Sequence, residues 1–333
     1  MFNIALVGGG VVTILHARAI SQCEYAKLAA VCDTVIEKAE AIAAQYHCNA
    51  YASFESMLEQ ERIDVAIICL PVFLHAEYAA KCAEAGIHVL CEKPMEMDAA
   101  QAQKIIDARD RCKVKMMVGH CVRFWPGYAD VKKMLDDGDL GEVLMATFSR
   151  ASMVPARGGW ILDPKLGRGA IQDMLIHDVD FLNYLFGDGE TVFANAVKDD
   201  TGCFNHIMAN IKFKNGVHAT AQAAFTMKNN SYPFTTQFPL CGTKATVEYR
   251  YQAAVLDIQA APQAEMMICR SGVPVETVKV ADYNAYVKQL QHFLDCIEKD
   301  VQPSMNPLES SLNSIRLLDA IRRSAETEQI EKV

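Results

Sequence analysis

A short apolar segment that runs directly into three glycines is the feature that most constrains how this chain folds. FNIALV (2–7) precedes Gly8-Gly9-Gly10, and a helix is expected from about Val11 to Gln22. A continuous apolar run of this length is typical of a strand buried on both faces of a parallel sheet. A glycine turn between such a strand and a helix predicts the first βα unit of a doubly wound sheet.

The strand and helix alternation continues to about residue 119, which predicts βαβ units with right-handed crossovers. Further strands are expected at Lys27–Cys32, Asn49–Tyr51, Val65–Leu70, His88–Cys91 and Lys115–Val118, and helices at Val35–Gln45, from Ser53, at His75–Ala85 and at Asp98–Cys112. A chain of 333 residues exceeds the usual size of one core, so a second domain is expected. We therefore predict a doubly wound α/β domain over residues 1–119.

The pattern changes after Gly119 and predicts an α+β domain over residues 120–333. A helix (Tyr128–Asp136), a strand (Glu142–Arg150), a Gly- and Pro-containing loop with Gly158, and one helix (Gly169–Phe186) are expected first. Strand-like segments follow at 193–200, 206–216, 217–226, 234–242, 245–252, 254–260 and 265–272. Their alternation of polar and apolar residues, with a hairpin signal at Asn215-Gly216, predicts a large, predominantly antiparallel sheet. Helices at Ala281–Lys299 and Pro307–Glu326 close the chain, and the pattern leaves open whether the last one packs back on the first domain.

The composition excludes several classes of function. The net charge of -9 and the absence of any Lys/Arg-rich block argue against a nucleic-acid partner. The N-terminal apolar run has no basic region before it and is too short for a signal peptide or a membrane span, which predicts a cytoplasmic protein. The twelve cysteines lie singly, without a Cys-x-x-Cys pair, and are interpreted as buried thiols, so no metal site is expected.

The glycine turn matches two of the three glycines of the dinucleotide-binding fingerprint of a Rossmann domain. Gly8 would permit the tight turn, and Gly10 would let the backbone approach a pyrophosphate at the helix N-terminus, beside Val11 and Val12. Thr13 replaces the third glycine, where a small residue still allows helix and strand to pack.

Asp33, which ends the next strand, decides which nicotinamide cofactor is expected. A carboxylate here accepts hydrogen bonds from a ribose diol and repels a 2′-phosphate. Since Thr34 follows and no Arg is adjacent, NAD is favoured over NADP. In the alternative reading, Asp33 only caps the following helix.

Three segments together carry a resemblance to a known family. They are CLPVFLHAEYAAKCAEAGIHVLCEKP (69–94), GHCVRFWPGY (119–128) and GRGAIQDMLIHDVDFLNYLFG (167–187). The chain resembles the Gfo/Idh/MocA oxidoreductases, such as glucose–fructose oxidoreductase and inositol dehydrogenase, over almost its whole length. The resemblance implies an NAD-dependent enzyme that transfers hydride to or from a ring hydroxyl or ketone of a sugar, sugar derivative or inositol. It also implies a cis Lys93-Pro94 bond and a homodimer or homotetramer.

The resemblance further implies that Lys93, Asp173 and His177 form the catalytic trio. The reaction needs a group that takes the hydroxyl proton and a cation that stabilises the developing alkoxide. His177 is preferred as the acid/base because an imidazole titrates near neutrality, whereas a lysine would need a much lower pKa. Asp173 and His177, four residues apart on a helix, would share one face. Without the resemblance, Lys93 would be a solvated loop residue and Asp173/His177 an ordinary helix pair.

Other candidates depend more weakly on the sequence. Leu70, Pro71, His75 and Glu92 are expected along the cofactor with Lys93, although His75 could equally be a scaffold residue. Arg123, Trp160 and Asp163 are candidates for the substrate pocket, although Trp160 could simply pack at the domain junction. Arg168, between two glycines, is expected to point to solvent, although it could instead reach a carboxylate or phosphate of the substrate.

Two other functions are compatible with the sequence. One is reduction of a non-carbohydrate substrate, as in the dihydrodiol dehydrogenase or biliverdin reductase branches of the family. The other is a non-catalytic NAD-sensing protein. The retained Asp173/His177 pair favours the sugar or cyclitol enzyme over both.

Overall fold

The computed structural model describes residues 1–155, 159–226, 232–254 and 262–333. These residues form two compact units, which are described separately. Unit 1 comprises Met1–Phe124 and Asn284–Leu312, and unit 2 comprises Trp125–Tyr283 and Asn313–Val333. Gly158 and all but the first residue of the predicted strand 254–260 lie outside the described residues.

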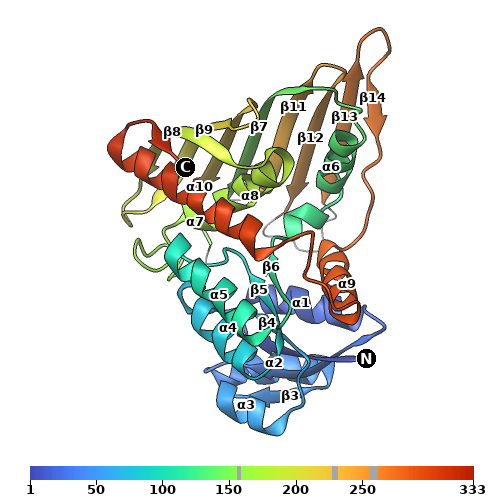
Figure 1. Cartoon of the computed structure of the whole chain (residues 1–333), viewed down its shortest axis with the longest axis vertical. Helices are drawn as coiled ribbons and strands as arrows, with labels where there is room; N and C mark the ends of the chain where they lie inside the picture. The colour runs from blue at the N-terminus through green and yellow to red at the C-terminus, as the bar shows by residue number, and fades with distance from the viewer. Residues whose placement is uncertain (156–158, 227–231, 255–261) are drawn as a thin grey trace. The chain divides into compact units, whose positions relative to one another are not determined.

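Unit 1 contains the parallel six-stranded sheet that the sequence predicts, and its strand order is β3-β2-β1-β4-β5-β6 (Figure 1). The strands are β1 (Phe2–Val7), β2 (Ala26–Cys32), β3 (Asn49–Tyr51), β4 (Val65–Ile68), β5 (His88–Glu92) and β6 (Met116–Gly119). The helices are α1 (Val11–Ser21), α2 (Ile36–Tyr46), α3 (Phe54–Gln60), α4 (His75–Glu84) and α5 (Ala99–Cys112), with short 3-10 turns η1 (Val72–Leu74) and η2 (Cys121–Phe124). The strand order reverses between β1 and β4, and ligands of doubly wound sheets bind at the carboxyl ends of the strands beside such a switch.

A helix from the far end of the chain completes the core of unit 1. Helix α9 (Ala285–Glu298) places Leu290, Phe293 and Leu294 in the same apolar cluster as residues of β1 and β4. The sequence predicts this helix from Ala281, but it begins after Asn284, whose side chain accepts a hydrogen bond from the backbone N–H of Tyr286. Asn284 is a typical N-cap residue, which explains the later start.

Unit 2 is built on a nine-stranded sheet in the order β14-β13-β12-β11-β7-β10-β9-β8-β15. The strands are β7 (Val143–Ser152), β8 (Gly189–Lys198), β9 (Phe204–Phe213), β10 (His218–Phe225), β11 (Phe234–Gly242), β12 (Ala245–Ala253), β13 (Gln263–Arg270), β14 (Glu276–Val278) and β15 (Glu331–Lys332). Neighbouring strands are antiparallel except β10 and β7, which are parallel. The predicted hairpin joins β9 and β10, with Gly216 at a φ of 90°.

The helices of unit 2 are α6 (Tyr128–Asp136), α7 (Ala170–Asp173) and α8 (Leu175–Phe186). Unit 2 also contains the part of α10 (Leu308–Thr327) that begins at Asn313. Figure 1 shows α8 and α10 on the same face of the sheet. The single helix predicted over Gly169–Phe186 is wrong, because a turn at Met174 separates α7 from α8.

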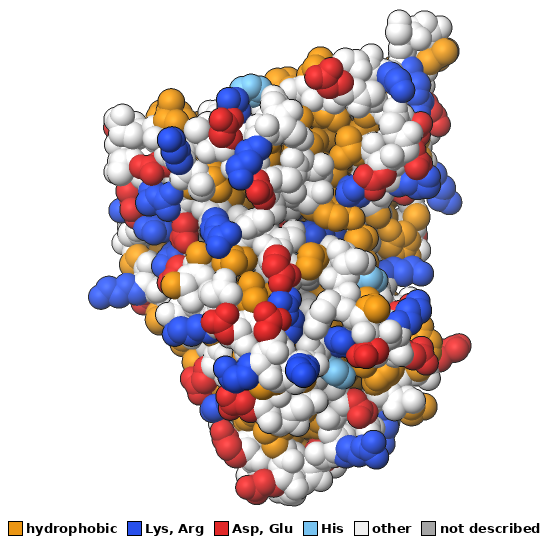
Figure 2. Space-filling view, viewed as in Figure 1, with side chains coloured by type: hydrophobic (Ala, Val, Ile, Leu, Met, Phe, Trp, Pro, Cys, Tyr) orange, Lys and Arg blue, Asp and Glu red, His pale blue; other side chains and the backbone are white. Residues whose placement is uncertain are grey.

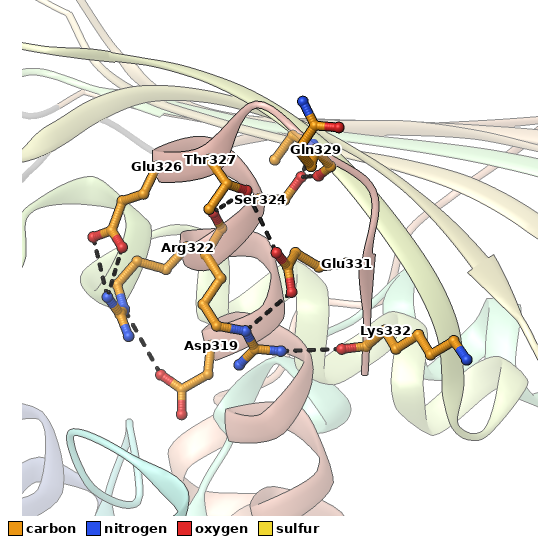
Figure 3. A network of polar contacts seen from close by, with 10 residues as sticks. Asp319, Arg322, Ser324, Glu326, Thr327, Gln329, Glu331 and Lys332 are labelled. Carbon is orange, nitrogen blue, oxygen red and sulfur yellow. Dashed lines mark hydrogen bonds and ion pairs between the residues drawn. The ribbon is translucent and has the colours of Figure 1, made fainter.

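The C-terminus is held to the sheet by a polar network (Figure 3). Arg323 donates hydrogen bonds to the Glu331 carboxylate and to the Lys332 carbonyl, and the Ser324 hydroxyl donates to the Gln329 carbonyl. Strand β15 then pairs with β8. These contacts hold the last residues in place, and the edge strand that Glu331–Lys332 form is not predicted by the sequence.

None of the helices described here is both long and apolar enough to cross a bilayer. Figure 2 shows acidic and basic side chains interspersed over the face that it draws.

Candidate functional site

The glycine turn after β1 has the geometry that the sequence predicts for the first glycine. Gly8 has a φ of +108°, and a Cβ there would lie 2.5 Å from the carbonyl oxygen of Cys69, so no other residue fits without a shift. A Cβ on Gly10 would meet nothing within 4 Å. The protein's own packing therefore does not require glycine at position 10, whereas close approach of a ligand to the backbone would.

Helix α1 begins directly after Gly10, so its first backbone N–H groups have no partner within the helix. Val11 is 64% exposed at this end. Thr13 is fully buried and its hydroxyl donates to the Gly8 carbonyl at 2.8 Å, which closes the turn where the fingerprint would have its third glycine. This N-terminus fits an anion such as a pyrophosphate.

Asp33 lies beside the turn, at the end of β2. Its Oδ2 accepts a hydrogen bond from the Gly9 N–H at 2.7 Å, and its Oδ1 accepts one from the Val35 N–H at 2.8 Å. Each carboxylate oxygen can accept more than one hydrogen bond, so both retain capacity for a ribose diol. Thr34 is exposed next to it. The side chain of Lys38, on α2, begins close to Gly9, because a Cβ on Gly9 would lie 2.8 Å from the Cβ of Lys38.

Lys93 follows β5 and is half-buried, and the Lys93-Pro94 bond is cis, as the resemblance implies. Its backbone N–H donates to Oε2 of Glu92 at 3.1 Å, and the other oxygen of Glu92 lies 2.7 Å from Nε2 of His16. Burial raises the pKa of Glu92, but the hydrogen bond and charge of His16 and the charge of Lys93 outweigh it, so the pKa lies below its usual value. The Glu92 carboxylate is thus ionised, although only 6% of the residue is exposed.

His75 is 1% exposed at the start of α4, and both of its ring nitrogens contact backbone carbonyls. Nδ1 lies 2.9 Å from the Pro94 oxygen and Nε2 lies 2.9 Å from the Leu70 oxygen. Burial lowers the pKa of His75, although the hydrogen bonds to the Leu70 and Pro94 carbonyls act in the opposite direction. His75 therefore connects the Leu70-Pro71 strand end with the Lys93 turn as a scaffold residue.

Asp173 and His177 are both half-buried, whereas Ile171, Met174 and Asp178 around them are buried. Asp173 is the last residue of α7 and His177 lies in the first turn of α8. The turn at Met174 lies between them, so they do not lie on one continuous helix as predicted.

A buried ion pair anchors α8 next to His177. Arg150, on β7, makes two hydrogen bonds to the Asp178 carboxylate, at 3.0 and 2.7 Å, and a third to the Tyr128 hydroxyl at 3.1 Å. The Tyr128 hydroxyl also bonds Thr236 at 2.6 Å. Asp178 and Arg150 are 0% and 2% exposed, so this network is enclosed within unit 2.

Arg123, a predicted substrate residue, is 1% exposed in η2. Its guanidinium donates to the Met305 carbonyl at 2.6 Å and to the Ser310 hydroxyl at 2.8 Å. Arg123 thereby fastens the segment after α9 within unit 1, and the substrate site proposed below does not include it.

The loop from Trp160 to Arg168 is shaped by its own contacts. The Asp163 Oδ1 accepts hydrogen bonds from the N–H groups of Lys165 and Leu166, and the Asp163 carbonyl accepts from Arg168. Trp160 is half-buried. The expectation that Arg168 points to solvent is wrong, because its guanidinium lies 3.8 Å from the Asp319 carboxylate on α10 and its side chain is only 21% exposed.

Comparison with known proteins identifies the family. Residues 2–120 match the oxidoreductase family with an NAD-binding Rossmann fold, and residues 128–248 match the GFO/IDH/MocA C-terminal domain. Inositol 2-dehydrogenase of Rhizobium meliloti (strain 1021) is 30% identical over 339 residues, which cover 98% of both chains. The chain belongs to the GFO/IDH/MocA oxidoreductase family.

Two further members of the family are similar over nearly their whole length. D-xylose 1-dehydrogenase (NADP(+)) 2 of Haloferax volcanii is 27% identical, with 98% of each chain covered. The crystal structure of a putative myo-inositol dehydrogenase from Sinorhizobium meliloti 1021 superposes with a TM-score of 0.80 at 25% identity, and all of both chains is covered. The protein is therefore an enzyme, an oxidoreductase with a Rossmann domain and a large, mostly antiparallel second sheet.

Several residues of this GFO/IDH/MocA enzyme escape the sequence analysis. Neither motif nor periodicity marks His16, Lys38, Gly119 and Arg150, because each of them contacts a residue 27 or more positions away. A sequence signal is present for one of these four residues, because His16 stands among apolar residues of α1. No group of three or more His, Cys, Asp or Glu side chains within the described ranges could hold a metal ion.

Proposed function

We propose that the enzyme transfers hydride between a nicotinamide dinucleotide and a ring hydroxyl or ketone of a sugar, sugar derivative or inositol. The observation that carries the proposal is the placement of Gly10, Asp33 and Lys93 after β1, β2 and β5. These strands are parallel, so the three residues share the carboxyl edge of one sheet, where doubly wound folds bind ligands. The names of the inositol and xylose dehydrogenases support a polyol substrate.

The cofactor, when bound, accepts or returns the hydride at its nicotinamide ring. The N–H groups of Gly10, Val11 and Val12 would hold its pyrophosphate, and Asp33 its adenosine ribose. Leu70 and Pro71, which end the neighbouring strand, would lie along it.

The residues of the chain would manage the proton and the charge on the reacting oxygen. We propose that His177 takes the hydroxyl proton during oxidation and returns it during reduction, while Asp173 orients the imidazole. The Lys93 ammonium would donate a hydrogen bond to the same oxygen and stabilise its developing negative charge. Trp160 and Asp163 are proposed to contribute to substrate binding through their loop.

NAD is proposed as the preferred cofactor. The carboxylate of Asp33 would repel a 2′-phosphate, whereas Lys38, the cation whose side chain begins beside Gly9, would attract one. Replacing Asp33 with Ser should therefore shift the ratio of kcat/KM values toward NADP. An unchanged ratio would contradict the assignment of cofactor preference to Asp33.

The test of the function is turnover of a polyol panel, containing myo-inositol, scyllo-inositol, D-xylose and D-glucose, with NAD or NADP, followed by reduced-cofactor absorbance. His177→Gln should lower kcat by about 10²–10⁴-fold, the usual contribution of a general acid/base. His206→Gln, an exposed histidine on β9, is the matched control. Cofactor binding without turnover of any polyol would refute the proposal.

A homo-oligomer is also proposed, with a second copy covering the open face of the unit 2 sheet. Met145, Val197 and Met208 are 51%, 64% and 53% exposed there. An exposed apolar sheet face of this kind is typical of subunit interfaces. Light scattering should give the mass of a dimer or tetramer, and Met208→Lys should reduce it; a monomeric mass would contradict the proposal. A cytoplasmic location stays a prediction.

A further inference from the structure

A pair of buried ionisable side chains in unit 1 connects two segments that flank the proposed cofactor site. His16 is 1% exposed on α1, and Glu92 is 6% exposed at the end of β5. Nε2 of His16 lies 2.7 Å from Oε1 of Glu92, a short contact between residues 76 positions apart. The imidazole is therefore the donor, because the ionised carboxylate can only accept.

The connection continues from the pair into the backbone of Lys93. The second carboxylate oxygen of Glu92 accepts the Lys93 N–H at 3.1 Å. Helix α1, His16, Glu92 and the Lys93 backbone thus form a continuous hydrogen-bonded chain. Its first member is the helix whose N-terminus is proposed to hold the pyrophosphate.

The surroundings leave the Glu92 carboxylate little freedom to move. A Cβ on Gly119 would lie 2.9 Å from Oε1 of Glu92, so β6 approaches the carboxylate closely enough that only glycine fits beside it. The ring of Tyr286, on α9, meets the His16 ring edge-on at a centroid distance of 5.1 Å. The other ionisable groups that interact electrostatically with Glu92 include Cys69, His75, Cys91 and Tyr286. Burial raises the pKa of the Cys69 and Cys91 thiols, so these remain neutral.

Stability alone is a poor explanation for such a pair. Burying a carboxylate and a polar partner costs several kcal/mol of desolvation, and well-packed apolar residues usually stabilise a core equally well. The pair provides a fixed acceptor for the Lys93 backbone N–H, which apolar residues cannot provide.

We propose that His16 and Glu92 are positioning residues that hold the backbone of Lys93, so that the side chain with its ammonium extends from a fixed backbone position. This inference rests on the role proposed for Lys93. Neither His16 nor Glu92 needs to touch the reacting atoms. A displacement of about 1 Å at a catalytic group can reduce the rate about 100-fold, which gives a purely geometric role a measurable effect.

Four variants separate positioning from stability. His16→Leu removes the donor, and His16→Gln keeps an N–H near the position of Nε2. The double variant His16→Leu/Glu92→Met replaces the pair with apolar side chains of similar size. Gly119→Ala leaves both partners in place but displaces the carboxylate. His88→Leu is the matched control, since His88 lies at the opposite end of β5 and its Nδ1 accepts the Lys115 N–H at 3.0 Å.

The measurements are kcat and KM for the best polyol, the NADH dissociation constant from fluorescence, and Tm. We expect His16→Leu and Gly119→Ala to lower kcat by about 10–100-fold while the NADH dissociation constant changes less than about threefold. His16→Gln should retain kcat to within about fivefold. The double variant should regain Tm but not kcat, and His88→Leu should lose Tm but not kcat.

Recovery of kcat together with Tm in the double variant would overturn the inference, because stability would then account for the effect. Equal losses of kcat in His16→Leu and His88→Leu would overturn it as well. So would a loss of NADH binding that matches the loss of kcat.

A measurement that needs no activity separates this inference from the proposed function. Hydrogen exchange of the peptide that contains Lys93 should accelerate at least about tenfold in His16→Leu and remain unchanged in His88→Leu. If the wild-type protein turned over no polyol, the proposed function would fail, and accelerated exchange would still support the hold on the Lys93 backbone. Unchanged exchange in His16→Leu would refute that hold, whatever the substrate.

Discussion

The buried pair of Arg150 and Asp178 allows a quantitative test of how unit 2 holds His177. We consider Arg150→Met, which removes the guanidinium and keeps most of the side-chain volume. The change removes both hydrogen bonds to the Asp178 carboxylate and the one to the Tyr128 hydroxyl. Tyr128 keeps Thr236 as a partner, so the damage is concentrated on Asp178.

The size of the effect follows from the burial of the two residues. Asp178 is 0% exposed, so the variant encloses a carboxylate that has lost its cation. Breaking a buried pair in this way costs about 3–5 kcal/mol of unfolding free energy. For a domain of 150–250 residues each kcal/mol lowers Tm by about 2–4 °C, so the expected decrease is between about 6 and 20 °C.

Two further variants make the measurement decisive. Arg150→Met/Asp178→Leu removes both charges and should recover to within about 2 kcal/mol of the wild-type protein. Arg270→Met breaks the exposed pair with Glu276, 2.8 Å long, and should cost less than about 1 kcal/mol. Urea unfolding followed by the near-ultraviolet signal of unit 2 gives the free energies. A loss of less than 1 kcal/mol in Arg150→Met, or a double variant no better than the single one, would refute the reasoning.

Three other predictions follow from the structure. Gly8→Ala should lower Tm because of its positive φ and the clash described above, whereas Gly10→Ala should leave Tm unchanged and weaken NADH binding at least about tenfold, as fluorescence titration would show. Deleting residues 329–333 should remove the β15 pairing and its side-chain bonds and lower the free energy of unfolding, measured with urea, by about 1–3 kcal/mol. An unchanged free energy of unfolding would contradict this. The stability that Glu92 gains from its lowered pKa is fully present above the unfolded-state value, about 4.3, and is lost as pH falls through the folded-state pKa. The stability difference between wild type and Glu92→Gln should therefore shrink on acidification below pH 4.3, and a constant difference would contradict this.

The parallel sheet of unit 1 could be predicted from the sequence because its signals are local. Each strand is a short apolar run bounded by a turn. Because both faces of β1 and β4 are buried, neither face needs polar residues, and the run stays apolar. The roles predicted for Gly8 and Asp33 also depend only on the strands that these residues directly follow. The cofactor half of the candidate site could therefore be proposed from the sequence.

The features that the sequence did not reveal depend on distant residues. The break at Met174 lacks a Gly or Pro, so the helical period continues through it and predicts one helix. The parallel pairing of β7 and β10 joins residues more than 70 positions apart, and no local pattern specifies that register. Arg123 was predicted as a pocket residue because an Arg and an aromatic residue beside a Gly- and Pro-containing loop suit polyol recognition, but its guanidinium is bound by Met305 and Ser310, more than 180 positions away.

A shared arrangement links the two halves of the proposed chemistry. Lys93 directly follows the buried carboxylate of Glu92, and His177 directly precedes the buried carboxylate of Asp178. In each case the buried residue pairs with a cationic or imidazole side chain from another element, and its neighbour in the chain is half-buried. Adjacent residues on a strand or a helix point in different directions, so fixing the buried carboxylate fixes the direction in which its neighbour projects. A buried pair of this kind is a costly way to stabilise a core but a strict way to set an orientation, and a strict orientation is what the roles proposed for Lys93 and His177 would require.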